Sequence, residues 1–128
     1  MARVGRADIG RKGEDIVCRY LASRGHTILE RNWRTGHLEV DIITLSGDGI
    51  HFVEVKTRMA PVAAAPEENV RMAKKQRMAK AAGIYMAVKD PALPPGAEAW
   101  LDVATVVLDG EKAEVEYYPG AYVPLWYG

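Results

Sequence analysis

EVDIITLSGDGIHFVEVKT, residues 39–57, is the stretch that decides the fold of this chain. Its two ends, residues 39–45 and 51–57, are rich in β-branched and apolar residues, and residues 46–49 between them are turn formers. Two β-prone runs joined by such a short turn are typical of a β-hairpin. The stretch therefore predicts two adjacent antiparallel strands.

The turn decides which residues of the two predicted strands face each other. A two-residue turn at Gly47 and Asp48, of type II′ with glycine first, places Asp41 opposite Glu54. A type I′ turn one residue later places Asp41 opposite Lys56 instead. In both registers the three charged residues share one face, because side chains along a strand alternate with a period of two.

Two carboxylates on facing strands call for a positive charge. Their Cβ atoms lie about 4.5–5.5 Å apart, and like charges at that separation destabilise a sheet. A Mg²⁺ or Mn²⁺ ion held by Asp41, Glu54 and the carbonyl of Val55 would resolve the repulsion. Such an ion is also what phosphodiester hydrolysis needs, with Lys56 to orient or deprotonate the attacking water or to stabilise the developing charge.

A plainer interpretation of the same residues is a solvated salt-bridge cluster. In that case Lys56 pairs with Asp41 or Glu54 and contributes about 0–1 kcal/mol to stability. The spacing alone does not separate the two interpretations. The Val and Ile residues around the charges are those of a buried sheet, where an uncompensated carboxylate pair is costly, and this favours the metal site.

The bulk properties fit one cytoplasmic domain over residues 1–128, with residues 119–128 as a C-terminal tail. A chain of 128 residues can bury a core without disulfides, and the single cysteine, Cys18, indicates a reducing compartment and a place in or near the core. The sequence shows neither a signal peptide nor a run of about 20 apolar residues. We therefore expect no membrane association.

Charge is unevenly distributed along the chain although its formal net charge is zero. Residues 1–89 carry 16 Lys and Arg against 10 Asp and Glu, and residues 90–128 carry 1 against 7. A basic portion that holds the candidate site suits a phosphate-rich partner, whereas the zero total argues against strong non-specific binding to nucleic acid.

The other elements follow from periodicity and turn signals. In chain order we predict a helix over 8–23, a strand over 26–33, a loop over 59–66, a helix that starts at Pro66 and ends before Asp90, and a second hairpin of strands 100–108 and 113–118. The loop adjoins the candidate site and could cover a substrate. The second helix is predicted to bury a partly apolar stripe of Val70, Ala73, Arg77, Ala81, Ile84 and Val88.

Five short motifs resemble those of the YraN-like family of uncharacterised bacterial proteins. They are, in chain order, Gly13-Glu14, Asn32-Trp33-Arg34, the run 39–43, the run 52–58, and Lys75-Gln76-Arg77. That family is assigned to the PD-(D/E)xK nuclease superfamily and is similar to archaeal Holliday junction resolvases. The match covers residues 10–102, and FVEVKTR at 52–58 is its most specific part.

The resemblance implies an α/β fold of the restriction-endonuclease-like kind. This is a three-layer α-β-α core with a mixed sheet, in the order α-β-β-β-α-β, here followed by a C-terminal edge strand. It also implies a magnesium- or manganese-dependent endonuclease that acts on DNA, in branched or repair intermediates, with a homodimer as one arrangement. Asp41, Glu54 and Lys56 would be its catalytic set, and Glu14 on the first helix would reach the metal. Leu38 and Val40 stand where the superfamily has Gly and Pro.

Further residues have weaker assignments. Glu39 shares the Asp41 face and would either support the metal ligands or bind the ion itself, or else pair with Arg34 or Arg58. Contacts to a DNA backbone are assigned to Arg34, Arg58, Lys75 and Gln76. The three histidines are given no catalytic role, Trp33 is placed in the core, and Asp102 is interpreted as a buried structural carboxylate near the first hairpin.

A rival class of function is a non-catalytic nucleic-acid or protein-binding module that kept a nuclease fold. Asp41, Glu54 and Lys56 are all present, and this favours the enzyme, because a protein that only binds has no reason to keep mutually repelling carboxylates.

Overall fold

The chain folds into two helices and a five-stranded mixed sheet in a computed structural model that describes residues 5–61, 68–88 and 93–122. The elements are α1 (Arg6–Ser23), β1 (Thr27–Thr35), β2 (Leu38–Ser46), β3 (Gly49–Met59), α2 (Glu68–Ala87), β4 (Ala99–Asp109) and β5 (Lys112–Tyr122). This order confirms the predicted restriction-endonuclease-like α/β fold, and each strand from the sequence pattern is present.

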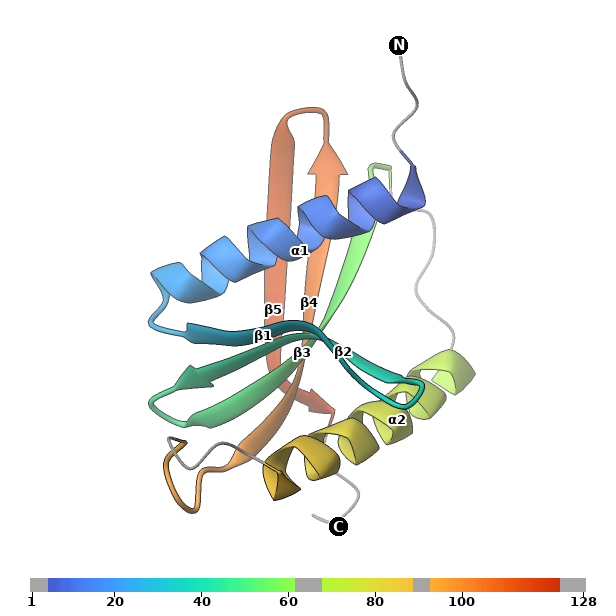
Figure 1. Cartoon of the computed structure of the whole chain (residues 1–128). Helices are drawn as coiled ribbons and strands as arrows, with labels where there is room; N and C mark the ends of the chain where they lie inside the picture. The colour runs from blue at the N-terminus through green and yellow to red at the C-terminus, as the bar shows by residue number, and fades with distance from the viewer. Residues whose placement is uncertain (1–4, 62–67, 89–92, 123–128) are drawn as a thin grey trace.

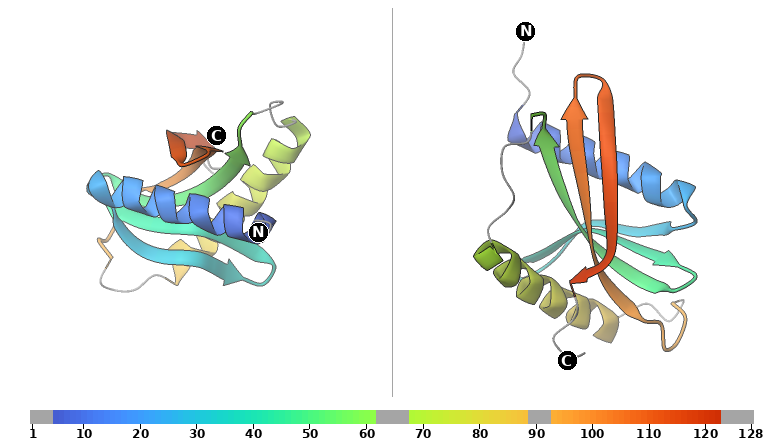
Figure 2. Two further views of the ribbon diagram at one scale, coloured as in Figure 1. Left: turned by 90° about the horizontal axis from the view of Figure 1, so that it is seen from above. Right: turned by 180° about the vertical axis from the view of Figure 1, so that it is seen from behind.

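The sheet has the spatial order β1-β2-β3-β4-β5. All neighbouring strands are antiparallel except β3 and β4, which run parallel. A parallel pair needs a crossover connection, and α2 provides it, so the chain from β3 through α2 to β4 forms a β-α-β unit. The two helices lie on opposite sides of the sheet (Figures 1 and 2).

Each face of the sheet has its own apolar core. On the α2 side, Phe52 and Leu101 of the sheet pack with Met78, Ala81 and Ala82 of the helix. On the α1 side, helix and strand residues form a second cluster, whose fully buried members include Val17, Leu21, Ile42, Val53 and Val106. Two cores with a sheet between them make the predicted three-layer arrangement.

Gly13 lets α1 approach β3 closely. A Cβ atom at this position would lie 1.8 Å from the Thr57 Oγ1 atom, so a larger residue would push the helix off the strand. The next residue along the helix is Glu14. The glycine of the Gly13-Glu14 motif therefore sets how near this carboxylate comes to the sheet.

The stripe predicted for α2 is partly wrong. Ala81 is fully buried and Ile84 is half-buried, but Ala73 and Arg77 are exposed and Val88 is 72% exposed. The buried face instead includes Met78, Ala79 and Ala82, because a helix of alanine, methionine and lysine offers several similar stripes and the sheet selects one. The side chain of Val70 lies outside the described residues.

The chain also differs from the prediction at its end. Residues 119–122, expected in the tail, extend β5, and Tyr122 is paired with Leu101 of β4. Residues 123–128 and 62–67 lie outside the described part of the chain, so the rest of the tail and most of the proposed covering loop stay predictions. Among the described helices, none is both long and apolar enough to cross a membrane.

Candidate functional site

The hairpin of β2 and β3 has the first of the two predicted registers. Its pairs run from Ser46 with Gly49 to Ile42 with Val53, which is the register of a two-residue turn at Gly47 and Asp48. The predicted type II′ turn is wrong. Such a turn needs a positive φ at Gly47, but in the structure the positive φ, 134°, is at Gly49. Gly49 is needed there because a Cβ atom would lie 2.3 Å from the Glu98 carbonyl oxygen.

The β2–β3 ladder ends just before the two predicted metal ligands. Ile42 and Val53 are its last pair, and in the same register Asp41 and Glu54 would come next. Beyond this pair the Asp41 side chain, and not a backbone carbonyl of β2, bonds to β3: its Oδ2 atom accepts the Val55 N–H at 2.8 Å. The end of the ladder therefore anchors the Asp41 carboxylate beside β3 and leaves room for a ligand next to it.

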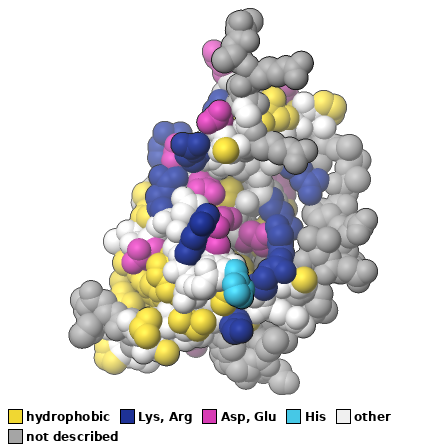
Figure 3. All heavy atoms as spheres, turned by 45° about the vertical axis from the view of Figure 1, so that its right-hand side comes forward, with side chains coloured by type: hydrophobic (Ala, Val, Ile, Leu, Met, Phe, Trp, Pro, Cys, Tyr) yellow, Lys and Arg dark blue, Asp and Glu magenta, His cyan; other side chains and the backbone are white. Residues whose placement is uncertain are grey.

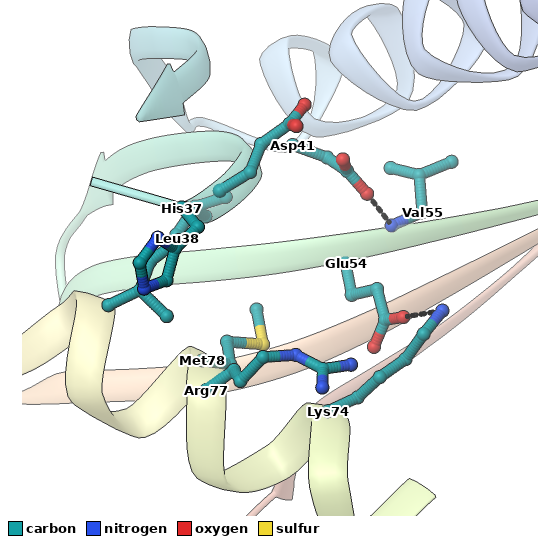
Figure 4. Close-up of a pocket in the computed structure, with 10 residues that line it drawn as sticks. His37, Leu38, Asp41, Glu54, Val55, Lys74, Arg77 and Met78 are labelled. Atoms are coloured by element: carbon teal, nitrogen blue, oxygen red, sulfur yellow. Dashed lines mark hydrogen bonds and ion pairs between the residues drawn. The ribbon is translucent and has the colours of Figure 1, made fainter. Parts of the chain in front are cut away.

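A cleft of about 410 Å³ opens at the end of this ladder. It is lined by residues of the β1–β2 turn, β2, β3 and α2, namely His37, Leu38, Glu39, Val40, Asp41, Glu54, Val55, Lys74, Arg77 and Met78. Figure 4 shows Asp41 and Glu54 on neighbouring strands, with Lys74 and Arg77 reaching toward Glu54 from α2. Asp41, Glu54 and Val55, three of the four predicted metal ligands, thus share one cavity.

The electrostatic state of Asp41 shows an excess of negative charge in the cleft. Burial raises the pKa of Asp41, the Val55 N–H lowers it, and Glu14, Glu54 and Glu39 raise it again, so that it reaches about 6. A carboxyl group with this pKa is still ionised at neutral pH, at a cost in stability. We name Glu14, Glu39, Asp41 and Glu54 the cleft cluster.

Glu14 carries an unsatisfied atom toward this cluster. Its Oε1 atom is buried and has no hydrogen-bond partner. Arg31 forms a long ion pair with it, since its Nη2 atom lies 4.0 Å from that oxygen and bonds to Asp15 at 2.6 Å. A buried carboxylate oxygen without a donor is costly, and it is rare in folded proteins. The Oε1 atom of Glu14 is therefore free to accept a hydrogen bond or to approach a cation.

The positive charges at the cleft differ from those predicted. The Nζ atom of Lys74 lies 2.8 Å from Glu54 Oε1, so this lysine of α2 pairs with the predicted ligand. Lys56 is half-buried on β3, beside Thr105 of β4, and is not among the residues that line the cleft. Its catalytic role stays a prediction.

Glu39 makes one of the ion pairs that the sequence suggested. Its Oε2 atom lies 3.2 Å from Arg34 Nη2, and both side chains are well exposed. Since Glu39 also lines the cleft, the pair places an arginine at the rim. A carboxylate engaged this way fits a supporting role better than direct metal binding.

Basic side chains surround the acidic centre of this face. Figure 3 shows acidic side chains in a hollow with Lys and Arg on either side. Of the predicted DNA contacts, Arg34 and Gln76 are exposed, and Lys75 and Arg58 are half-buried. Arg34 is joined to the cleft through its ion pair with Glu39.

The donor set suits a hard divalent cation. Carboxylate and carbonyl oxygens are the ligands that Mg²⁺ prefers, and Mg²⁺ keeps several waters, so two carboxylates and one carbonyl can suffice. Within residues 5–61, 68–88 and 93–122, three or more acidic, histidine or cysteine side chains nowhere gather closely enough to surround one ion. Asp41, Glu54 and the Val55 carbonyl are thus the residues of the cleft that could hold a divalent ion with water completing its coordination.

Sequence reasoning missed Lys74, Arg77 and His37 as cleft residues. Spacing places Lys74 and Arg77 one turn before Met78 and Ala81, but only the structure shows that this side of α2 is the buried one. A buried helix face that turns basic at one end indicates a site. His37 gives no comparable signal, since it stands alone in a turn.

A second polar cluster lies near the β2–β3 turn. The buried His51 bonds through Nδ1 to Asp102 Oδ2 at 2.5 Å and through Nε2 to Asp48 Oδ1 at 2.7 Å. Asp102, with 0% exposure, also accepts the Tyr117 hydroxyl and, at 2.8 Å, the Gly120 N–H. We name this set the histidine network; its members are Ser46, Asp48, His51, Asp102 and Tyr117. It confirms that Asp102 is a buried structural carboxylate near the first hairpin.

The histidine network has the residue types of a hydrolase triad but not its proton arrangement. Burial alone would lower the pKa of His51, but the hydrogen bonds to Asp102 and Asp48 outweigh it and the pKa is raised. With a carboxylate on each ring nitrogen, the imidazolium is favoured and has no lone pair for a base. Ser46 donates to Asp48 at 2.5 Å, and its Oγ atom lies 3.1 Å from His51 Nε2, which donates to it when the ring is protonated. The network therefore stabilises the fold and does not activate a nucleophile.

Comparison with known proteins places these residues in a family context. A family model described as "Uncharacterised protein family UPF0102" matches residues 13–106. The chain is 38% identical over 117 residues to a UPF0102 protein of Dictyoglomus turgidum, covering 90% of this chain and 97% of the relative. It is 41% identical over 118 residues to one of Syntrophotalea carbinolica, covering 91% and 93%.

A third relative is longer. The UPF0102 protein of Oleidesulfovibrio alaskensis is 48% identical over 81 residues, which are 63% of this chain and 40% of that protein. The matched segment of the family model contains Glu14, Asp41, Glu54 and Lys74. The cleft therefore lies inside the region that the family shares.

Proposed function

The chain belongs to the uncharacterised protein family UPF0102, the YraN family, and we propose that it is a metal-dependent endonuclease that hydrolyses phosphodiester bonds in DNA. One observation carries the proposal: Asp41, Glu54 and the Val55 backbone line one cleft, and the pKa of Asp41 is raised in part by Glu14, whose Oε1 atom is buried without a hydrogen-bond partner. Such an arrangement is costly for a fold and useful for holding a cation.

The residues present fit a divalent ion. Asp41, Glu54 and the Val55 carbonyl would hold it, and Glu14 would approach from α1. A bound Mg²⁺ or Mn²⁺ supplies charge neutralisation at a phosphate and an acidified water. The orphaned oxygen of Glu14 and the raised pKa of Asp41 are the structural support for this fit.

The chain's own side chains have distinct tasks in this proposal. The Val55 N–H fixes the Asp41 carboxylate in one orientation. Lys56, two residues after Glu54, would orient the attacking water or stabilise the charge that develops on the phosphate. Arg34, Arg58, Lys75, Gln76 and Arg77 would contact the DNA backbone, because long cationic and amide side chains around an acidic centre offset the repulsion of a phosphate.

The test is a cleavage assay with linear, single-stranded, flapped and four-way DNA, in Mg²⁺ or Mn²⁺ and in EDTA. We expect cation-dependent cutting of at least one substrate and its loss in Asp41→Asn and Lys56→Ala. The exposed residues of the β4–β5 turn provide matched controls, Asp109→Asn and Lys112→Ala, which should cut like the wild type.

Three outcomes would contradict the proposal. Failure to cut any substrate argues against the enzyme, and equal cutting by Asp41→Asn argues against this site. DNA binding that is independent of cation and never leads to cutting would favour the binding module instead.

A further inference from the structure

We propose that Lys74 is an internal counter-ion that competes with the divalent cation for Glu54 and, once displaced, binds the phosphate of the substrate. This inference rests on the proposed function, because it concerns how the same cleft is regulated. Its starting point is the 2.8 Å contact between Lys74 Nζ and Glu54 Oε1. The ammonium group lies where positive charge is needed when no metal is bound.

The contact is built into the fold and is not a chance meeting on the surface. Glu54 follows Phe52 on one face of β3, and the fully buried Phe52 ring packs against Tyr85 of α2 with ring centroids 5.6 Å apart. On the helix, Lys74 lies one turn before Met78, which is 5% exposed in the same core. The core thus fixes the helix against the strand and holds the lysine stem over Glu54.

The two principal carboxylates have counter-groups of different mobility (Figure 4). Asp41 accepts a backbone N–H, which cannot leave without breaking β3. Glu54 is paired with a lysine, whose long stem can swing away from the carboxylate. A cation arriving between them would therefore keep Asp41 in place and displace Lys74, because an ammonium group and a divalent ion at one carboxylate repel each other.

The released ammonium group has a use beside the metal. The Lys74 side chain is 42% exposed, and Arg77 lines the same cleft from the same helix, so the two can present positive charge to an entering phosphate. Metal binding would then create part of the phosphate site. Linkage is reciprocal. A phosphate ligand that binds Lys74 must therefore raise the affinity for the cation by the factor by which the cation raises the affinity for phosphate.

The first test measures Mn²⁺ affinity by calorimetry. Lys74→Met keeps the length of the stem and removes the charge, so we expect it to bind Mn²⁺ about three- to tenfold more tightly than the wild type. Lys74→Arg keeps the competing charge and should bind like the wild type. Lys80→Met, at an exposed position of the same helix, is the matched control and should leave the affinity unchanged.

The second test adds thymidine 5′-monophosphate as a phosphate probe and follows thermal unfolding in EDTA and in saturating Mn²⁺. The probe should raise the Mn²⁺ affinity of the wild type but not of Lys74→Met. The variant should melt below the wild type in EDTA, and Mn²⁺ should remove or reverse that difference. A lysine with only a structural role would lower the melting temperature equally in both conditions.

The results separate this inference from the proposed function. If Lys74→Met binds Mn²⁺ no more tightly than the wild type while Asp41→Asn abolishes binding, the counter-ion role is wrong and the metal site stands. If Lys74→Met binds more tightly but no DNA is ever cut, the counter-ion role stands and the endonuclease is wrong. Absence of Mn²⁺ binding in every variant overturns both.

Discussion

The cleft cluster and the histidine network both contain carboxylates at or beside the sheet, yet their hydrogen bonding differs. In the network, Asp102 is fully buried and accepts from His51, Tyr117 and the Gly120 N–H. In the cluster, Glu14 Oε1 is buried without a hydrogen-bond partner, and burial, together with neighbouring carboxylates, raises the pKa of Asp41 to about 6. The Asp102 carboxylate has hydrogen-bond donors for its oxygens, whereas the Glu14 Oε1 atom has none.

The difference shows which carboxylates stabilise the fold and which are kept at a cost. Buried polar groups in folded proteins are nearly always paired, so a network that meets this rule needs no ligand to explain it. Exceptions to the rule concentrate at functional sites. The contrast therefore supports a ligand at the cleft and a structural role for the network, and both halves can be tested by mutation.

Loss of Asp102 should have the largest effect on stability. Asp102→Ala leaves His51 and Tyr117 without their buried partner, and we expect the free energy of unfolding to fall by about 3–5 kcal/mol. Urea denaturation measures this change. Asp109→Ala, on an exposed residue of the same strand, should stay within about 0.5 kcal/mol of the wild type. Similar values for the two variants would mean that the network does not stabilise the fold.

Loss of the charge at Asp41 should raise the free energy of unfolding, by less than loss of Asp102 lowers it. The folded-state pKa of about 6 lies above the ordinary 3.8, so the folded protein favours the protonated form and the ionised form costs stability above about pH 6. Asp41→Asn can still accept the Val55 N–H, and we expect it to raise the free energy of unfolding by about 2 kcal/mol at pH 8.

The same sign fixes the pH dependence of this gain. It should decline as the pH falls through 6 and vanish below about pH 4, where Asp41 is protonated in both states. Urea denaturation of both proteins from pH 4 to 8 measures it. A variant that is less stable than the wild type at pH 8 would show that the carboxylate is adequately paired.

Deprotonation of His51 should change the free energy of unfolding least of the three. Its raised pKa means that the imidazolium stabilises the fold below the ordinary value of 6.5, and that this contribution is lost as the pH rises through the folded-state pKa. His51→Gln should therefore cost more at pH 6 than at pH 9, by about 1 kcal/mol, the difference between a charged and a neutral hydrogen bond.

An NMR titration of the His51 ring checks the cause directly. The midpoint should lie above 6.5, in line with the two carboxylates that bond to the ring. His37, exposed in the β1–β2 turn, serves as an internal reference in the same spectra. A midpoint below 6.5 would reverse the expected pH dependence.

Features that depend on short-range pattern were predictable from the sequence. The sequence limited the hairpin to two registers, of which the structure has one, and Cys18 and Trp33 pack against the cores as expected from their types. The buried Asp102 was also foreseen, because a single carboxylate in an apolar strand must find partners. The three-layer arrangement of helices and sheet was expected from the resemblance of the five short motifs to a known family.

Features that depend on how α2 rotates against the sheet were not predictable. A helix with many alanines has no unique apolar stripe, so Arg77 was placed on the partly apolar stripe and in fact lines the cleft. The Lys74 pair with Glu54 has the same origin, since it joins residues of different elements. The twin pairing of His51 with Asp48 and Asp102 likewise depends on the three-dimensional approach of β4 to the hairpin.

Paramagnetic broadening by Mn²⁺ tests most directly that the cleft cluster, and not the histidine network, is the cation site. Asp48, at the turn end of the histidine network, lies about 15 Å or more along the hairpin from Glu54, at roughly 3.3 Å per residue, so the signals of these two residues can be affected separately. At substoichiometric Mn²⁺ we predict that the amide signals of Asp41, Glu54 and Val55 broaden first, and that Asp41→Asn abolishes this. Broadening centred on Asp48, or unchanged in Asp41→Asn, would contradict the account.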